Sequence, residues 1–177
     1  IFTQKGRCFW MRIFEVPEGS KQSKGRAIQN LINIDLDDKI LAYIPVKDIK
    51  DPEYANANYV VLATKQGLIK KTSLEAYSRP RTNGINAITI REGDELLQAK
   101  LTNGENEVIL ALKSGKAIRF NESKTRAVGR TAMGVKGITL GGPDDEVIGM
   151  VCVQDAESSV LVAVSYTHLT LPTIRSV

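Results

Sequence analysis

Residues 60–71 read VVLATKQGLIKK, and this stretch decides the fold. Both ends are rich in β-branched and apolar residues, which favour strands. Gly67 between them can adopt the positive φ that a three-residue hairpin loop requires. The stretch therefore predicts two antiparallel strands joined by a tight turn. The same pattern returns as VILALKSGKAIR at residues 108–119, and TQKGRCFW at residues 3–10 fits its turn and second strand.

A period of about fifty residues relates these segments. The β-rich runs that begin at Val60, Val108 and Val160 lie 48 and then 52 residues apart. A second glycine-bearing segment and an acidic turn follow in each repeat, at residues 25–38, 84–95 and 134–146. Four short strands in about 50 residues are typical of propeller-like blades, which bury their apolar faces only against neighbouring blades. We therefore predict an all-β, propeller-like array of four-stranded blades.

The repeat also predicts boundaries along the chain. We expect a blade truncated at its start at 1–47, a blade with an interblade loop at 48–106, a blade at 107–158, and the first strand of another at 159–165. The interblade loop is expected at 47–58, a shorter loop at 103–106, and a single helical turn at 73–77. We expect strands 60–63 and 108–111 to be buried and the acidic turns to be exposed. The chain does not begin with Met, so we expect a fragment.

Composition excludes several classes of protein. A content of 42% hydrophobic and 25% charged residues is globular, and it excludes disorder and collagen. No apolar run reaches the length of a membrane span and no signal peptide is visible, so we expect no membrane partner and a cytoplasmic location. The cysteines, Cys8 and Cys152, lie far apart, and the one histidine is His168. Neither a disulfide framework nor a zinc site is expected, and both thiols are predicted to be buried and inert.

Charge is segregated within the repeat. Residues 5–26, 65–81 and 113–136 together hold 18 of the 24 basic residues and 4 of the 20 acidic ones. Equivalent segments of an array lie on equivalent surfaces, so this pattern predicts a basic belt that suits the phosphates of duplex DNA. The alternative is that these lysines only provide solubility and protect strand edges. The candidate DNA-binding residues are Lys5, Arg7, Arg12, Lys21, Lys24, Arg26, Lys65, Lys70, Lys71, Arg79, Arg81, Lys113, Lys116, Arg119, Lys124, Arg126, Arg130 and Lys136.

Other motifs carry less chemistry. Residues 129–137 are rich in glycine and basic residues, yet they match neither a P-loop nor a dinucleotide fingerprint. The acidic clusters at 35–38 and 144–146 each fall in the same turn of the repeat, which favours solvated turns over a metal site. No Ser, Cys or Lys stands in a nucleophile motif. We therefore expect no catalytic residue, no metal and no cofactor in this chain.

Five segments resemble one known family closely and in order. They are KGRAIQNL at 24–31, KKTSL at 70–74, NGINAI at 83–88, AIRFNES at 117–123 and GRTAMGV at 129–135. These segments are similar to the C-terminal domain of DNA gyrase A, over about residues 1–164. The resemblance implies a β-pinwheel of six blades, of which this chain holds the second to fourth and the first strand of the fifth.

The resemblance also implies a function. Domains of this family wrap DNA around a basic rim, so that a type IIA topoisomerase introduces negative supercoils. Gyrase B would bind the ATP and Mg²⁺ and hydrolyse the ATP, and gyrase A would form a homodimer through its N-terminal portion. The cleaving tyrosine of the family follows an arginine in that portion. No tyrosine of this chain follows an arginine, so no catalytic residue transfers.

Two departures from the family pattern leave alternatives open. The family's Gln-, Arg- and Gly-rich box belongs to the first blade, which this chain lacks, so the corresponding C-terminal domain of topoisomerase IV is also possible. A propeller-like protein-interaction module is a second alternative, for which an apolar rim patch would be expected instead of a basic belt. Residues 166–177 break the repeat and resemble translated sequencing-adapter sequence, so we expect a non-native tail.

Overall fold

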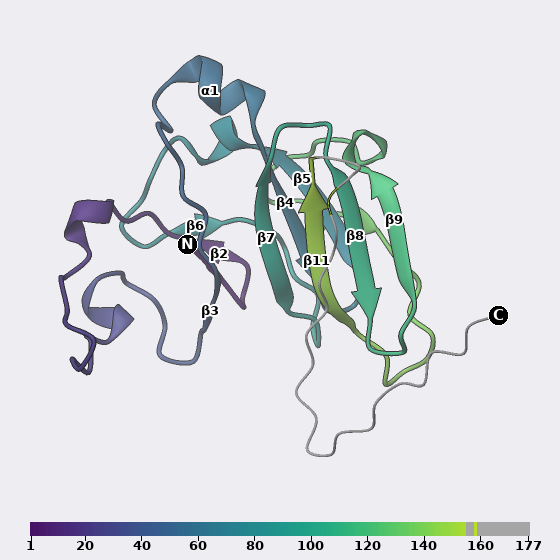
Figure 1. Cartoon of the computed structure of the whole chain (residues 1–177), viewed down its shortest axis with the longest axis horizontal. Helices are drawn as coiled ribbons and strands as arrows, with labels where there is room; N and C mark the ends of the chain where they lie inside the picture. The colour runs from purple at the N-terminus through teal and green to yellow at the C-terminus, as the bar shows by residue number, and fades with distance from the viewer. Residues whose placement is uncertain (155–157, 159–177) are drawn as a thin grey trace.

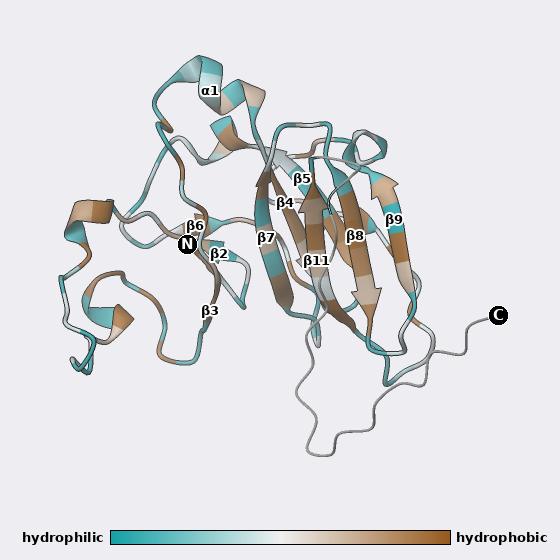
Figure 2. Cartoon of the chain, viewed as in Figure 1, coloured by the Kyte–Doolittle hydropathy of each residue, from teal (hydrophilic) through white to brown (hydrophobic). Residues whose placement is uncertain are grey.

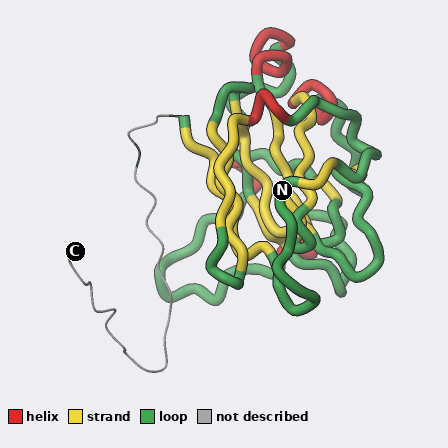
Figure 3. Tube along the Cα trace, turned by 90° about the vertical axis from the view of Figure 1, so that its right-hand side faces the viewer, coloured by secondary structure: helices red, strands yellow, loops and turns green. Residues whose placement is uncertain are grey.

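Three antiparallel β-sheets lie side by side in the computed structural model, which describes residues 1–154 and 158 (Figures 1 and 3). The first sheet has the strand order β3-β1-β2-β6, with β1 at Phe2–Thr3, β2 at Arg7–Cys8, β3 at Ile40–Ala42 and β6 at Ile85–Asn86. The second has the order β10-β5-β4-β7, with β4 at Tyr59–Thr64, β5 at Leu68–Ser73, β7 at Leu96–Thr102 and β10 at Val135–Lys136. The third has the order β11-β8-β9, with β8 at Glu107–Leu112, β9 at Ala117–Asn121 and β11 at Val147–Val153.

The predicted hairpins form as expected. β1 pairs with β2, β4 with β5 and β8 with β9, all antiparallel. The turn glycines Gly6, Gly67 and Gly115 have φ of 77°, 85° and 84°, which confirms the conformation predicted for the third turn position. The loop at 103–106 and the single helical turn are also present, the latter as η3 at Leu74–Tyr77.

Two strands cross from one repeat into the sheet of the preceding one. β6 lies between β5 and β7 in sequence but pairs with β2 of the first sheet, with Ile85 opposite Cys8. β10 lies between β9 and β11 but pairs with β5 of the second sheet, with Val135 opposite Ile69. Each of these sheets is therefore completed by a two-residue strand from the following repeat. Contiguous segments of sequence do not correspond one to one with sheets.

The apolar residues of neighbouring sheets meet in two cores. One core joins the first and second sheets through Phe2, Cys8, Val60, Leu62 and Leu96. The other joins the second and third sheets through buried side chains on β4, β5, β8 and β11, namely Val61, Ala63, Ile69, Val108, Leu110, Val147 and Met150. The central strands are accordingly apolar in Figure 2. The second sheet is covered on both faces, which explains why strand 60–63 is buried throughout, as predicted.

The third sheet differs from its prediction. Val108 and Leu110 are buried, whereas Ile109 and Ala111 are only half-buried. The alternation arises because one face packs on the second sheet and no described residues cover the other face. Strand 108–111 is therefore only partly buried, contrary to the expectation. The strand predicted at 159–165 and the tail predicted at 166–177 lie outside the described residues.

Short helices connect the strands. The segment expected to be a loop at 47–58 contains helix α1 at Pro52–Ala57, so that expectation was wrong. Asp51 caps it by accepting a hydrogen bond from Glu53 N at 3.0 Å, and Pro52 occupies the first turn. Three further single turns are η1 at Ile13–Glu15, η2 at Ile28–Asn30 and η4 at Glu122–Lys124. Within the described residues, no helix has the length and apolarity that crossing a lipid bilayer demands.

The sheet order defines an inner and an outer edge for the array. β7 packs against both β3 and β11, so these three last strands of their repeats lie together at the inner edge. The opposite edge of each sheet is formed by β6, β10 or β9. We call the latter strands, with the loops that lead into them, the outer edge.

Replacing Gly134 by alanine tests the crossing of β10 into the second sheet. Its φ is 95°, and an added Cβ would lie 2.5 Å from Ile69 O. We expect Gly134→Ala to lower the free energy of unfolding by about 3 kcal/mol, through backbone strain and displacement of β10. Gly115→Ala is the matched control, because its φ is similarly positive and no heavy atom lies within 4 Å of an added Cβ. Gly115→Ala should lower the free energy of unfolding, measured with urea, by only about 1 kcal/mol. Equal losses in the two variants would contradict the crossing of β10 into the second sheet.

Candidate nucleic-acid interface

Basic residues gather along the outer edge of the three sheets. Lys136 lies on the edge strand β10, Lys116 directly precedes the edge strand β9, and Arg7 lies on β2, which is paired with the edge strand β6. The inner strand β7 carries one basic residue, Lys100. The strand order thus places basic residues of the second and third repeats at the outer edge, whereas most of those of the first repeat lie in the loop between β2 and β3. The loops that lead into β6 and β10 carry further exposed cations, namely Arg79, Arg81, Lys124 and Arg126, whereas the exposed cations Arg12, Lys21, Lys24 and Arg26 lie in the loop between β2 and β3.

The guanidinium groups nearest the crossing strands are held by backbone carbonyls. Arg7 Nη2 donates to Asn83 O, in the loop before β6. Arg130 Nη1 donates to Asn86 O at 3.3 Å, and its loop is fixed by a hydrogen bond of 2.6 Å from Thr89 Oγ1 to Thr131 O. Carbonyls leave the positive charge uncompensated, so both groups remain available to attract phosphate.

Lys70 is used inside the fold instead. Its side chain is 0% exposed, and Nζ donates to Ala87 O at 2.7 Å and to Arg130 O. Burial, together with the charge of Arg130, lowers the pKa of Lys70 to about 8. The amine of Lys70 on β5 therefore bonds to two other segments of the backbone. Ala87 directly follows β6, and Arg130 lies in the loop before β10. Lys70 therefore stabilises the crossing and presents no charge to solvent.

Lys71 is also internal. Its Nζ lies 3.4 Å from Glu122 Oε2 and 4.4 Å from the centre of the Tyr59 ring. Glu122 is fully hydrogen-bonded, because it accepts from Thr102 Oγ1 at 2.8 Å and from two backbone N–H groups in the loop at 103–106. This buried pair connects the second and third sheets. We therefore restrict the candidate interface to the exposed basic residues and leave out Lys70 and Lys71.

Some lysines of the hairpin turns are paired with acidic turns. Lys5 Nζ lies 2.6 Å from Asp37, and Lys65 Nζ lies 2.9 Å from Glu95. These partners raise the pKa of both lysines. The separation of basic and acidic surfaces expected from the sequence is therefore incomplete.

The third repeat divides its cations in the same way. Arg119 Nε donates to Glu107 Oε2 at 3.1 Å, so its charge is partly neutralised. Lys113, at the third turn, has no ion pair among the described residues. Of these two cations, Lys113 is therefore the more available to phosphate.

One aspartate in each acidic turn has a structural role that the sequence reasoning missed. Asp38 Oδ1 accepts from Lys5 N at 3.1 Å, Asp94 Oδ1 from Gln66 N at 2.9 Å, and Asp145 Oδ1 from Ser114 N at 3.0 Å. Asp38 and Asp94 are buried, so the expectation of exposed acidic turns was wrong for them. Hydrogen bonds from Gly141 N and Ser114 also lower the pKa of Asp145. The recurrence of an aspartate at this position of each repeat is the sequence signal from which the structural role could have been predicted.

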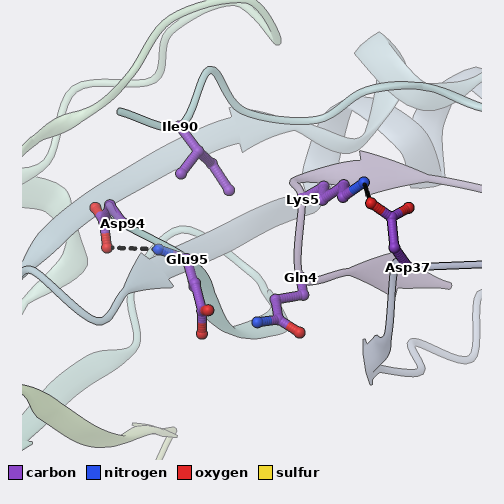
Figure 4. A pocket seen from close by; sticks show the side chains of 6 residues that line it. All are labelled: Gln4, Lys5, Asp37, Ile90, Asp94 and Glu95. Atoms are coloured by element: carbon purple, nitrogen blue, oxygen red, sulfur yellow. Dashed lines mark hydrogen bonds and ion pairs between the residues drawn. The ribbon is translucent and has the colours of Figure 1, made fainter. Parts of the chain in front are cut away.

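An open hollow of about 440 Å³ lies beside two of these turns (Figure 4). Its acidic excess would repel phosphate, so it does not belong to the candidate interface. It is lined by Gln4, Lys5, Ile90 and the carboxylates of Asp37, Asp94 and Glu95.

The described residues offer no metal site and no reactive thiol. Among residues 1–154 and 158, no three His, Cys, Asp or Glu side chains are grouped to hold a metal ion. Burial raises the pKa of the thiols of Cys8 and Cys152 to about 12, which makes both unreactive at neutral pH. Cys8 is buried as predicted, whereas Cys152 is only half-buried.

Comparisons with known proteins agree with the fold and the repeat. A family model described as the DNA gyrase C-terminal domain, a beta-propeller, matches residues 1–47, 58–103 and 106–154. The chain is 43% identical over 150 residues to the DNA gyrase A protein of Salmonella typhimurium, and 44% identical over 163 residues to that of Staphylococcus epidermidis. These alignments cover 85% and 92% of this chain. The chain spans only 16% and 18% of the length of those two relatives.

Two solved structures share the architecture. The C-terminal domain of a DNA topoisomerase IV superposes with a TM-score of 0.76 at 31% identity, covering 87% of this chain and 46% of that one. A DNA gyrase A C-terminal domain superposes with a TM-score of 0.69 at 23% identity, covering 86% of this chain and 46% of that one. The predicted β-pinwheel, or propeller-like, fold class is thereby confirmed.

The buried amine of Lys70 predicts a dependence of stability on pH. Its folded pKa of about 8 lies below the ordinary value of 10.5, so between these values the unfolded chain binds the extra proton. Stability contributed by Lys70 is therefore lowest below pH 8 and rises as the pH increases towards 10.5. We expect the unfolding free energy of the wild-type protein, relative to that of Lys70→Met, to rise by about 2 kcal/mol from pH 7 to 9.5. Urea unfolding at both pH values measures it, and a constant difference would contradict the buried position.

The aspartate that fixes the second hairpin turn gives another test. Asp94→Ala removes the acceptor of Gln66 N and Glu95 N. We expect it to lower the free energy of unfolding by about 2 kcal/mol, because two N–H groups lose a charged acceptor. Asp144→Ala is the control, since Asp144 is exposed and accepts no hydrogen bond from the described residues. Its midpoint in urea should match that of the wild-type protein, and an equal loss in both variants would refute the role given to Asp94.

Proposed function

The chain belongs to the family of DNA gyrase C-terminal domains, and on that premise we propose that it binds duplex DNA and helps to wrap it. The observation that carries the proposal is the placement of exposed cations along one edge of three successive sheets. Lys and Arg release condensed counterions from DNA without reading its bases. Binding should therefore be tolerant of sequence and strongly dependent on salt.

The repeat geometry supports wrapping beyond simple attachment. Successive sheets present equivalent edges, so phosphate contacts continue from one sheet to the next along an arc. Bending a short duplex by 40° to 90° costs on the order of 1 to 6 kcal/mol, and contacts spread along the arc offset this cost. A single cluster of cations would give affinity without imposing a bend.

In the whole protein, we propose that this region serves a type IIA topoisomerase that introduces negative supercoils. The partners would be a second copy of gyrase A, joined through another part of that protein, and gyrase B. Gyrase B would bind ATP and Mg²⁺ and hydrolyse the ATP, and the assembly would act in the cytoplasm. This chain would contribute DNA binding and no catalytic residue.

Topoisomerase IV supplies a second candidate. The superposition on the topoisomerase IV C-terminal domain favours it, with higher identity and a higher TM-score than the superposition on the gyrase domain. The named relatives at 43% and 44% identity favour gyrase. An activity assay distinguishes the gyrase candidate from the topoisomerase IV candidate. In it, this region is fused to a gyrase A that lacks its own C-terminal domain, and gyrase B and ATP are added. Negative supercoiling of relaxed circles would support gyrase, and relaxation alone, starting from supercoiled circles, would support topoisomerase IV.

Charge reversal at the outer edge tests the DNA-binding surface. Arg81→Glu, Lys116→Glu and Lys136→Glu replace exposed cations from the second and third repeats. If roughly six cations neutralise phosphates, the slope of log K against log salt is about −5, and the triple variant should lower its magnitude by about 3. Affinity for a linear duplex, measured by fluorescence anisotropy at several salt concentrations, should fall steeply at low salt.

The control has the same change of charge at another place. Lys47→Glu, Lys50→Glu and Lys100→Glu also replace exposed lysines, all outside the candidate interface. Three reversals of two charges each take the formal net charge of +4 to −2 in both triple variants. The control should keep the wild-type salt slope. Equal losses of affinity in the two variants would show that only net charge matters and would refute a localised interface.

A further inference from the structure

Backbone carbonyls in the segment at 83–89, which contains β6, accept hydrogen bonds from basic side chains of all three repeats. The donors are Arg7 of the first repeat, Lys70 of the second and Arg130 of the third. Arg7 and Arg130 are half-buried, whereas Lys70 is 0% exposed. The contact from Arg130 Nη1 to Asn86 O, at 3.3 Å, places a cation of the third repeat at the outer edge of the first sheet.

The loop at 129–132, which carries Arg130, is held through its backbone from two sides. Lys70 Nζ donates to Arg130 O. From the side of β6, Thr89 Oγ1 donates to Thr131 O at 2.6 Å, and the N–H of the same threonine donates to the carbonyl of the following residue at 3.3 Å. The buried amine of Lys70 thus bonds to the backbone of the residue whose guanidinium lies at the outer edge.

The first hairpin shows that the fold does not require an amine at this position. The third residue after the turn glycine is Phe9 in the first hairpin and Lys70 in the second. Phe9 is also buried, and it packs in an apolar cluster with Ile32 and Ile34. Burial removes the hydration of an ammonium group, so lysine is less favourable for stability here than an apolar residue. What the amine adds is its hydrogen bonds to two backbone carbonyls.

We propose that Lys70 is a positioning residue for DNA binding, whose ammonium fixes the loop at 129–132 and so holds the Arg130 guanidinium at the outer edge of the first sheet. The proposal rests on the proposed function, because it takes Arg130 to be one of the cations that contact phosphate. Hydrogen bonds from a charged donor are about twice as strong as those from a neutral one, so the ammonium orders the loop better than an uncharged amine. A cation that is ordered before DNA arrives loses less entropy on binding.

Loss of a proton from Lys70 should therefore weaken its hold on the loop. The charged and titratable groups around this amine are Arg130 before β10, Tyr77 on η3, which donates to Ala87 O at 3.4 Å, and Cys8 on β2. Arginine stays charged at every pH of interest. Burial raises the pKa of Tyr77 and raises that of Cys8 to about 12, whereas burial and Arg130 lower that of Lys70 to about 8. Among these groups, Lys70 is thus the one that changes charge between pH 7 and 9.

DNA affinity and stability should respond to this proton in opposite directions. The contribution of Lys70 to stability rises as the pH increases from 8 towards 10.5, whereas its hold on the loop requires the proton. We expect the wild-type protein to bind a linear duplex about fivefold more tightly than Lys70→Met does at pH 7, and about equally at pH 9. Fluorescence anisotropy at fixed salt measures both affinities. A ratio that is constant, or that rises with pH as stability does, would indicate a merely structural lysine and overturn the proposal.

A double-mutant cycle tests whether Lys70 acts through Arg130. Arg130→Met should lower the affinity about tenfold and the magnitude of the salt slope by about 1, because one phosphate contact is lost. Lys70→Met should lower the affinity about fivefold when Arg130 is present and less than about twofold in the Arg130→Met background. Lys100→Met, which removes an exposed charge from the inner strand β7, is the control and should have little effect in either background. Additive losses from Lys70→Met and Arg130→Met would overturn the proposal.

Thr89→Val provides the same cycle without a change of charge. It removes the hydrogen bond to Thr131 O and keeps the shape of the side chain. Circular dichroism and urea unfolding check that each variant is folded. The loss of DNA affinity should again be confined to proteins that retain Arg130, and an equal loss in the Arg130→Met background would contradict positioning by the loop.

Failure of the proposed function gives a different result from failure of this inference. If the chain does not use its exposed cations to bind DNA, the wild-type protein lacks a steep salt dependence and Arg130→Met has no effect, which overturns both. If the salt dependence is steep and the losses in the cycle are additive, the inference alone is overturned.

Discussion

The close approach of backbone to backbone at the crossing strands governs the rest of this structure. The backbone of Gly134 lies so near Ile69 O that a side chain has no room, and Gly84 makes the same approach to Cys8 O. Glycine permits both the positive φ and the short distance. Each approach brings a β-branched residue into register with the receiving strand and sends an isoleucine into the core. The first and second sheets are therefore finished by residues that belong to later repeats.

The crossing also determines which basic residues are available to the phosphates of DNA. Since the crossing strand takes the outermost position in its sheet, the basic segments around it lie at the outer edge. Lys70 and Lys71 sit one strand further in, and their ammonium groups bond to carbonyls, a carboxylate and a ring. Such buried cations cannot release counterions from DNA. The surface that is available to phosphate is therefore smaller than the count of basic residues in the repeat implies.

Much of this could be predicted from the sequence because the repeat is internal to it. The turn glycines and the hairpins around them recur at one period, and that recurrence placed them correctly. The crossing of β6 and β10 was missed, since a two-residue strand has no periodicity and its partner lies in another repeat. Helix α1 was missed although Asp51-Pro52-Glu53 is a good start signal. The burial of Lys70 was hidden because hydropathy assigns lysine to the surface.

The basic residues of the outer edge have two roles, protection of the strand edge against unwanted pairing and attraction of phosphate. Strand edges with free backbone groups invite pairing with unrelated chains, and lysine or arginine on an edge strand opposes it through charge and desolvation. The same cations attract phosphate. At β9 both roles fall to Lys116 and Arg119, and Arg119 is partly neutralised by Glu107 at 3.1 Å.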